Sequence, residues 1–494
     1  MKLKKTFISL IASLTLLASC KKFLDVNHTP NNPISVTPAV QLPNTTIGIA
    51  FASANDLDRV TSALVQHIAG TANQTLGYDV FNFSGAFDNS WTGELYDGAI
   101  SNLLLMIKND STSPIYTGIA KLELAYAFSM VIDLWGDAPY SEAGMGLNNL
   151  RPRFDKVQDI YQGNSSLGIT SLFDLVRSGI ADLNKGGGLY KPGVDDIVYG
   201  GNAGKWKRMG NTLMLKFAIQ LTNVNPALAT SVINEVLASA DGYINSSSLD
   251  FAVPFSSTVG NQNPLYTFNN VNRSGDQMLS LRLLNLSKSL NDTVRLSKFF
   301  TKPNGKFTAF DNGSTAAAPT QATRSRYNTY LTGDRSGDAA SGKAGGDSSI
   351  KLLTCFQVNF ILAEAVIRLG VPGDANAYYQ QGIRASMQKV GIDTGAISAY
   401  FAANPTVVTL SGTSEEQVRQ IITQKYIAWI GNGIEAYNDY RRTGYPVLAL
   451  PLNAGGDNPN VIPARLPYTN QELSRNPNAP NPRPQVDVKL WWAK

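Results

Sequence analysis

The sequence predicts a mainly α-helical protein, built from pairs of helices with long irregular loops between them. Apolar residues recur every three or four positions in many segments, several of which follow a Ser or Asn that can cap a helix. Residues 356–390 form two such segments in a row, about the length of one tetratricopeptide unit of ~34 residues. Alternating strand-like runs are few, and the 42 Gly and 24 Pro residues indicate long loops.

The first twenty residues form a leader. Three lysines precede an apolar run at residues 7–18, which is too short to span a bilayer and is typical of a secretory signal. The run ends in Leu-Ala-Ser-Cys, which resembles the bacterial lipobox, in which Cys20 becomes the acylated first residue. An ordinary signal peptide with an unmodified cysteine is the alternative. We therefore expect a signal peptide at residues 1–19, a lipidated tether at 20–43, and one folded domain at 44–494.

The charge and the cysteine content of the chain limit the classes of function to consider. The three leader lysines account for three of the five excess positive charges, so the remaining chain carries only +2 and no basic cluster with interleaved aromatics. This argues against a nucleic-acid partner. Cys355 is the only cysteine besides Cys20, so an acylated Cys20 leaves no disulfide within the chain, and we expect Cys355 to be a buried thiol.

Start and stop signals predict the helices in order. Ser113-Pro114 opens a helix that Gly136 ends, and Ser414 with Gln417 resembles a capping box. The expected helices cover residues 55–70, 91–107, 114–135, 171–184, 205–222, 227–240, 277–290, 356–369, 379–390 and 414–429. Irregular chain is expected at residues 71–90 and 301–349, and as a wrapping tail from residue 444 to the end, and a region of loops and strands at residues 242–274.

Seven segments carry a further pattern. They are residues 23–27 (FLDVN), 90–96 (SWTGELY), 134–140 (LWGDAPY), 290–296 (LNDTVRL), 426–446, 462–468 (IPARLPY) and 472–476. In this order they resemble motifs of the SusD/RagB family. The most specific piece is residues 426–446, which include Glu-Ala-Tyr at 435–437 and Arg-Arg-Thr-Gly-Tyr-Pro at 441–446. Thr293 stands where the family has Pro.

The resemblance implies a tetratricopeptide-like scaffold whose loops carry the ligand face. It implies a lipoprotein of the Bacteroidetes outer membrane, held by acyl chains and exposed at the cell surface. It implies a non-catalytic role without a cofactor: capture of glycan or peptide nutrients and delivery to a SusC-like TonB-dependent transporter. Family members often have acidic residues after the lipidated cysteine, a feature linked to export to the cell surface. Lys21 and Lys22 follow Cys20 here, so the sequence does not decide between the cell surface and the periplasmic side of the outer membrane.

Two loop regions combine aromatic and amide side chains, the mixture that a glycan site needs for sugar C–H faces and hydroxyls. The first holds Asn73, Gln74, Tyr78, Phe81 and Phe83. The second holds Tyr266, Phe268, Asn269, Asn270 and Arg273, with Tyr327 as a further wall. Trp91 is an additional candidate, although core packing is the favoured role for it. The alternative for all the aromatics is that they anchor long loops to the scaffold.

Two other functions stay open, a surface glycan hydrolase and a structural envelope lipoprotein. His28 and His67 are the only histidines and no Gly-x-Ser-x-Gly elbow occurs, which argues against a zinc site or a serine hydrolase. Asp195-Asp196 is typical of a turn, and Arg441-Arg442 of structural ion pairs. A structural calcium ion in the Asp-rich residues 334–347 is neither predicted nor excluded.

Overall fold

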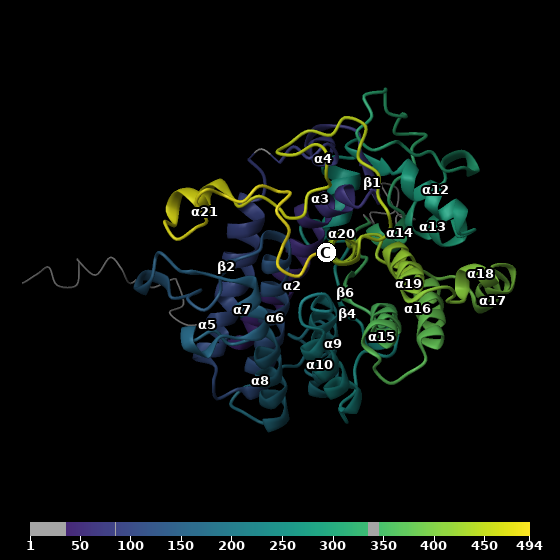
Figure 1. The fold of residues 1–494 in the computed structure, drawn as a ribbon. Coiled ribbons are helices and arrows are strands. Elements are labelled where there is room, and N and C mark those ends of the chain that lie inside the picture. The colour runs from purple at the N-terminus through teal and green to yellow at the C-terminus, as the bar shows by residue number, and fades with distance from the viewer. Residues whose placement is uncertain (1–35, 84, 334–344) are drawn as a thin grey trace, which may run out of the picture.

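The computed structural model describes residues 36–83, 85–333 and 345–494. The leader, Cys20, His28 and most of the Asp-rich segment 334–347 lie outside these residues, and so do the predictions made for them. The described chain is mainly helical, as the sequence predicts, with helices along one side and a more irregular region at the opposite end (Figure 1).

A row of helix pairs forms the scaffold. Its members are α6 (Pro114–Trp135), α8 (Leu172–Lys185), α9 (Ala203–Gln220), α10 (Pro226–Ala238), α15 (Cys355–Leu369), α16 (Ala375–Lys389) and α19 (Ser414–Ala428). Helix α6 packs on α8, α8 on α9, α9 on α10, and α15 on α16 and α19 (Figure 1). Because neighbours in sequence pack side by side, the paired arrangement predicted from the sequence is confirmed.

Capping residues begin and end these helices where the sequence predicts. The Ser171 hydroxyl accepts a hydrogen bond from the Asp174 amide at 2.9 Å, and Asn225 caps α10 with Pro226 at its first position. Gly370 ends α15 in the left-handed conformation, with φ of 65°. The capping box of α19 is formed by Thr413 and Glu416, one residue before the predicted pair.

Helix α2 (Pro38–Ala54) overlaps the end of the predicted tether, so the expectation of irregular chain up to residue 43 is wrong for its last six residues. Pro38 occupies the first turn, where its missing N–H costs nothing. Pro43 lies inside the helix, and burial of Leu42 and Ile49, on a helix that packs against residues 89–100, offsets its cost.

Two predicted helices are shorter than expected, and each has a strand at one end. Residues 55–70 fold as α3 (Asp56–Leu64) and β1 (Ile68–Gly70), and residues 277–290 as β5 (Gln277–Leu279) and α12 (Leu281–Ser289).

The 71–90 segment, predicted to be irregular, contains α4 (Asn73–Asp79). The segment at 91–107 is helical as predicted, first as the π-helix η1 (Asn89–Ile100) and then as α5 (Ser101–Asn109).

The remaining elements are short. The strands are β2 (Ala138–Pro139), which pairs with β3 (Phe154–Asp155), and β4 (Phe251–Val253), which pairs with β6 (Ile350–Leu353). The helices are η2 (Gly146–Asn148), α7 (Val157–Gln162), η3 (Ser165–Leu167), η4 (Ser247–Leu249), α11 (Pro264–Tyr266), η5 (Thr267–Asn272), α13 (Thr293–Phe299), η6 (Pro303–Gly305), α14 (Thr329–Thr332), α17 (Thr394–Ala403), α18 (Pro405–Val408), α20 (Gly433–Thr443) and α21 (Asn470–Arg475). The tail after α20 crosses the irregular end, as the sequence predicts (Figure 1).

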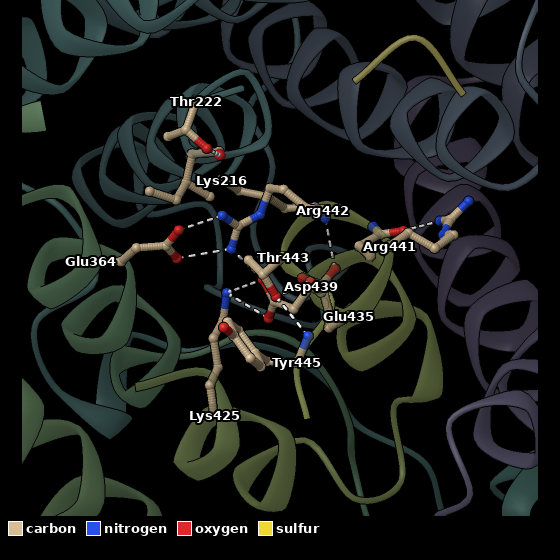
Figure 2. Close-up of polar contacts among 12 residues, drawn as sticks. Lys216, Thr222, Glu364, Lys425, Glu435, Asp439, Arg441, Arg442, Thr443 and Tyr445 are labelled. Atoms are coloured by element: carbon tan, nitrogen blue, oxygen red, sulfur yellow. Dashed lines mark hydrogen bonds and ion pairs between the residues drawn. The ribbon is translucent and has the colours of Figure 1, made fainter. Parts of the chain in front are cut away.

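A network of buried charges holds α20 at the centre of the fold (Figure 2). Arg442 contacts both carboxylate oxygens of Glu364 on α15, and it lies 2.8 Å from Asp439. Lys425 of α19 lies 2.9 Å from the other oxygen of Asp439, and Lys216 of α9 lies 2.7 Å from Glu435. The predicted structural role of the Arg441-Arg442 pair is therefore confirmed for Arg442, and Arg441 donates to the Ala464 carbonyl at 3.0 Å.

Helix α6 is long and apolar enough to cross a membrane, but 89% of its most apolar window is buried inside the protein. It is the central core helix. Cys355 is also buried, as predicted.

Glu123 is a carboxyl group buried between α6 and α2. It accepts hydrogen bonds from the hydroxyls of Thr45 at 3.0 Å and Thr46 at 2.5 Å. Burial raises the pKa of Glu123 to about 8. Because this folded-state value lies above the ordinary one, folding binds a proton between pH 4.5 and 8, and stability falls as pH rises through that window.

We expect Glu123→Gln, which cannot ionise, to raise the free energy of unfolding at pH 8 by on the order of 3 kcal/mol. The gain should vanish near pH 4.5, so the variant's pH profile is flatter than that of the parent. Urea unfolding at several pH values measures this, with Glu235→Gln on the surface of α10 as control. Parallel profiles for parent and variant would contradict it.

Candidate functional site

Strand pairing brings the two predicted loop regions together. Strand β1 pairs antiparallel with β5, with Gly70 opposite Gln277. Helix α4 follows β1 and the π-helix η5 precedes β5, so these two elements meet at the same edge (α4 and β1 are seen near the top of Figure 1). The Thr71 amide donates to the Asp276 carbonyl at 2.8 Å, and the Asn73 side chain donates to the Asp276 carboxylate at 2.9 Å.

An aromatic ring and a guanidinium group are in contact where α4 and η5 meet. The guanidinium carbon of Arg59, on α3, lies 3.8 Å from the centroid of the Phe268 ring. Arg59 is buried and also lies 2.6 Å from Asp56 and 3.5 Å from the Gln74 side-chain oxygen. One face of the Phe268 ring is therefore fixed against a cation, an arrangement that orients the ring.

Tyr78 contacts the same cluster through Asp56. Its hydroxyl donates to the two carboxylate oxygens of Asp56 at 2.8 and 2.9 Å. Burial and the neighbouring Asp56 raise the pKa of Tyr78 well above its ordinary value, so the hydroxyl stays a donor at neutral pH. Asp56 thus joins Tyr78 to Arg59 and positions the guanidinium.

We call the accessible part of this cluster the α4–η5 face. Its residues are Asn73, Gln74, Phe268, Asn270 and Arg273, with Arg59 behind the ring. Asn73, Gln74 and Arg273 are exposed, whereas Phe268 and Asn270 are half-buried. Both polar atoms of the Asn270 amide are buried without a partner among the described residues, so only the rest of this side chain contributes to the accessible surface.

The other predicted residues are buried. They are Tyr78 (1% exposed), Phe81 (3%), Phe83 (8%), Trp91 (2%), Tyr266 (6%), Asn269 (5%) and Tyr327 (1%). Apart from Phe81 and Phe83, these side chains pack inside the protein and anchor the loops to the scaffold, the alternative that the sequence left open. Asn269, for example, accepts a hydrogen bond from Gln277 at 2.8 Å and donates one to the Leu265 carbonyl at 2.8 Å.

Trp91 has the core role favoured for it. Its ring packs edge-on against Trp135 at 5.2 Å and Tyr468 at 6.0 Å, and it stacks on Phe154 at 6.5 Å. Phe81 and Phe83 instead line a cavity between their loop and the C-terminal tail.

Three residues of the site were missed from the sequence: Asp56, Arg59 and Asp276. Asp56 and Arg59 are three residues apart on a helix, which is a usual spacing for an ion pair, so this pair could have been recognised from the sequence. Asp276 becomes part of the site only through the β1–β5 pairing, which the sequence did not predict.

The histidine and the paired aspartates that could suggest a catalytic site have structural surroundings. His67 is fully buried, its Nε2 lies 3.0 Å from the Tyr426 carbonyl, and burial lowers its pKa to about 3. Asp196 closes a turn, accepting from the amides of Val198 and Tyr199 at 3.1 Å. Among the described residues, no group of three His, Cys, Asp or Glu side chains is placed to hold a metal ion.

Residues 30–469 match the model of a SusD-like family described as "Starch-binding associating with outer membrane". The chain belongs to this family. The match covers most of the sequence, so the family resemblance found in the seven motifs is confirmed. No curated protein matches the chain.

Solved SusD-like structures share the fold. A chitin-binding protein is 24% identical, with a TM-score of 0.76 over 92% of this chain and 100% of its own. A chitin-binding SusD homologue from Flavobacterium johnsoniae is 20% identical, with a TM-score of 0.71 over 91% of this chain and 98% of its own. A SusD homologue from Bacteroides fragilis is 22% identical, with a TM-score of 0.75 over 93% of this chain and 100% of its own. These SusD-like relatives confirm the fold along nearly the whole chain.

Proposed function

We propose that this SusD-like protein is a non-catalytic lipoprotein that binds glycans at the α4–η5 face and delivers them to an outer-membrane transporter. The observation that carries the proposal is the convergence of the two loop regions through β1 and β5. Arg59 connects the two regions, because its guanidinium covers the Phe268 ring at 3.8 Å and lies 3.5 Å from the side-chain oxygen of the exposed Gln74. A flat ring with amide groups around it suits the C–H face and the hydroxyls of a sugar.

N-acetylated glycans are the first ligands to test. Two structural neighbours are described as chitin-binding, and the face offers amide and guanidinium donors that suit an acetamido carbonyl. Peptides are the second class, because the same donors suit peptide carbonyls.

The charges at the face favour binding over hydrolysis. A glycosidase of the usual kind needs two available carboxyl groups flanking the scissile bond. Here Asp56 is engaged by Arg59 and Tyr78, and Asp276 by Asn73. Measurable turnover on a polysaccharide panel would overturn the non-catalytic part of the proposal.

The leader supports the proposed lipid anchor, and family membership supports the proposed transporter partner. We expect Cys20 to carry acyl chains and the protein to sit over a SusC-like TonB-dependent barrel. Co-purification from detergent-solubilised outer membranes tests this. A large β-barrel protein recovered in equal amount supports delivery to a transporter, whereas recovery of the lipoprotein alone, where other barrel complexes survive, argues against it.

Glycan binding itself is tested by calorimetric titration of the chain from residue 21 with chito-, malto- and other oligosaccharides. Saturable binding of at least one class supports the proposal. Absence of binding across glycans and peptides would overturn it.

We expect Phe268→Ala to weaken binding of the best oligosaccharide by roughly 10- to 100-fold, because it removes the only aromatic platform that we assign to the α4–η5 face. Gln74→Ala should weaken it by about 10-fold through one lost hydrogen bond. Calorimetry measures both. Leu167→Ala, which removes an exposed apolar side chain elsewhere, is the control and should leave the affinity unchanged.

A further inference from the structure

A cavity lies between the loop residues 81–83 and 85–88 and the C-terminal tail. Its volume is about 330 Å³, within the range of small-molecule pockets. The side chains that matter here are the rings of Phe81, Phe83 and Tyr468 and the polar groups of Asn82, Asp457 and Arg483. The cavity and the α4–η5 face lie at opposite ends of α4, a helix ~10 Å long.

The cavity is held by contacts on two sides. The Gly455 amide donates to the Val80 carbonyl at 2.8 Å, and the Gln471 amide donates to the Asp88 carboxylate at 3.1 Å. Gly456 lies so close to the loop that a Cβ there would be 2.3 Å from the Phe81 carbonyl oxygen, and its φ is +70°. Only glycine permits this approach, so the tail and the loop form one wall.

Aromatic rings form the floor. Phe81, Phe83 and Tyr468 are each less than 9% exposed, so their rings are fixed by packing. The Tyr468 hydroxyl already donates to the Asp137 carbonyl at 2.6 Å, which leaves the ring as its contribution to the cavity. Phe81 and Phe87 have φ of 67° and 75°, a strained conformation for bulky residues that is concentrated at functional sites.

The rim is polar and balanced in charge. Arg483 lies 3.3 Å from Asp457, with 42% and 26% of the two side chains exposed. Asn82 and Asn470 are also exposed there. Donors and acceptors thus surround an aromatic floor without an excess of either charge, which suits a neutral sugar rather than a uronic acid or a charged amino sugar.

We propose that this cavity is a second subsite for neutral sugar units of the glycan that the protein binds. The inference rests on the proposed function. It assigns a ligand role to Phe81 and Phe83 through the cavity, apart from the α4–η5 face.

The test uses the chain from residue 21, chito-oligosaccharides and malto-oligosaccharides of increasing length, and calorimetry. The first variant combines Asn82→Ala with Arg483→Met and removes polar side chains from the edge of the cavity. The second, Asn470→Trp, blocks its entrance. Each should weaken binding by roughly tenfold, or remove one bound equivalent, as expected for lost hydrogen bonds to a ligand. Arg177→Met is the matched control, because Arg177 is also ion-paired and 40% exposed, on α8.

The outcomes separate the two proposals. Weakened binding by both cavity variants, with unchanged thermal unfolding, supports the subsite. Glycan binding that Phe268→Ala weakens and the cavity variants leave unchanged overturns the subsite and keeps the proposed function. A parent protein that binds no oligosaccharide overturns both.

Discussion

Arg442→Met is expected to lower the free energy of unfolding by about 3–5 kcal/mol, the cost of breaking a buried ion pair by removing one partner. Methionine keeps much of the volume but leaves Glu364 and Asp439 in the core without the guanidinium that contacts both (Figure 2). Among the residues that the structure describes, Glu364 would keep Arg368, at 3.3 Å, and Asp439 would keep Lys425 as its one remaining ion-pair partner.

Urea unfolding followed by circular dichroism measures this loss. Arg177→Met removes an ion-paired arginine from the exposed face of α8 and should cost less than about 1 kcal/mol. If the two variants lost the same stability, the buried network would not be what holds α20 in place.

The same network predicts acid sensitivity. Burial opposes the charged form of Asp439, but Lys425 and Arg442 outweigh it and hold the pKa of Asp439 below its ordinary value. Because the folded-state pKa is depressed, this contribution is present above the ordinary carboxyl pKa and is lost as pH falls through the folded-state value.

Trp492→Ala should cost about 3–5 kcal/mol, the usual range for truncating a fully buried tryptophan. The Trp492 side chain is 0% exposed and lies 4.8 Å from the Arg441 guanidinium, so it fixes the end of the tail against α20. The Lys494 amide, which donates to the Arg441 carbonyl at 3.0 Å, would be released with it.

Trp491 offers a matched comparison one residue away. It is only half-buried, so Trp491→Ala should cost about 1 kcal/mol or less. Equal losses for the two tryptophans, measured by urea unfolding, would mean that the tail packs loosely and does not stabilise α20.

Helices with strong local signals could be predicted from the sequence. Ser171, Asn225 and Gly370 act where their positions indicate, because a cap needs only nearby backbone groups. The sequence does not predict helix α2, because Pro38 is typical of irregular chain, whereas tertiary packing decides the fold of this segment. Helix α4 was missed because it has only seven residues and contains Gly77.

The site could be predicted only in part. The sequence identified both loop regions, but the contact between residues 70 and 277 depends on three-residue strands far apart in the chain. The sequence also does not show which aromatic side chains are exposed and which are buried. Phe268 and Tyr266 have similar sequence surroundings, yet one remains half-exposed and the other packs inward, because exposure depends on which loop covers each ring.

Hydrogen exchange of the chain from residue 21, measured with and without a saturating oligosaccharide, locates the bound ligand directly. We predict that binding slows exchange at residues 71–80 and 264–276, which flank the β1–β5 pair and carry the α4–η5 face. Unchanged exchange in both segments, with slowed exchange elsewhere in the protein, would contradict the assignment of this face as the glycan site.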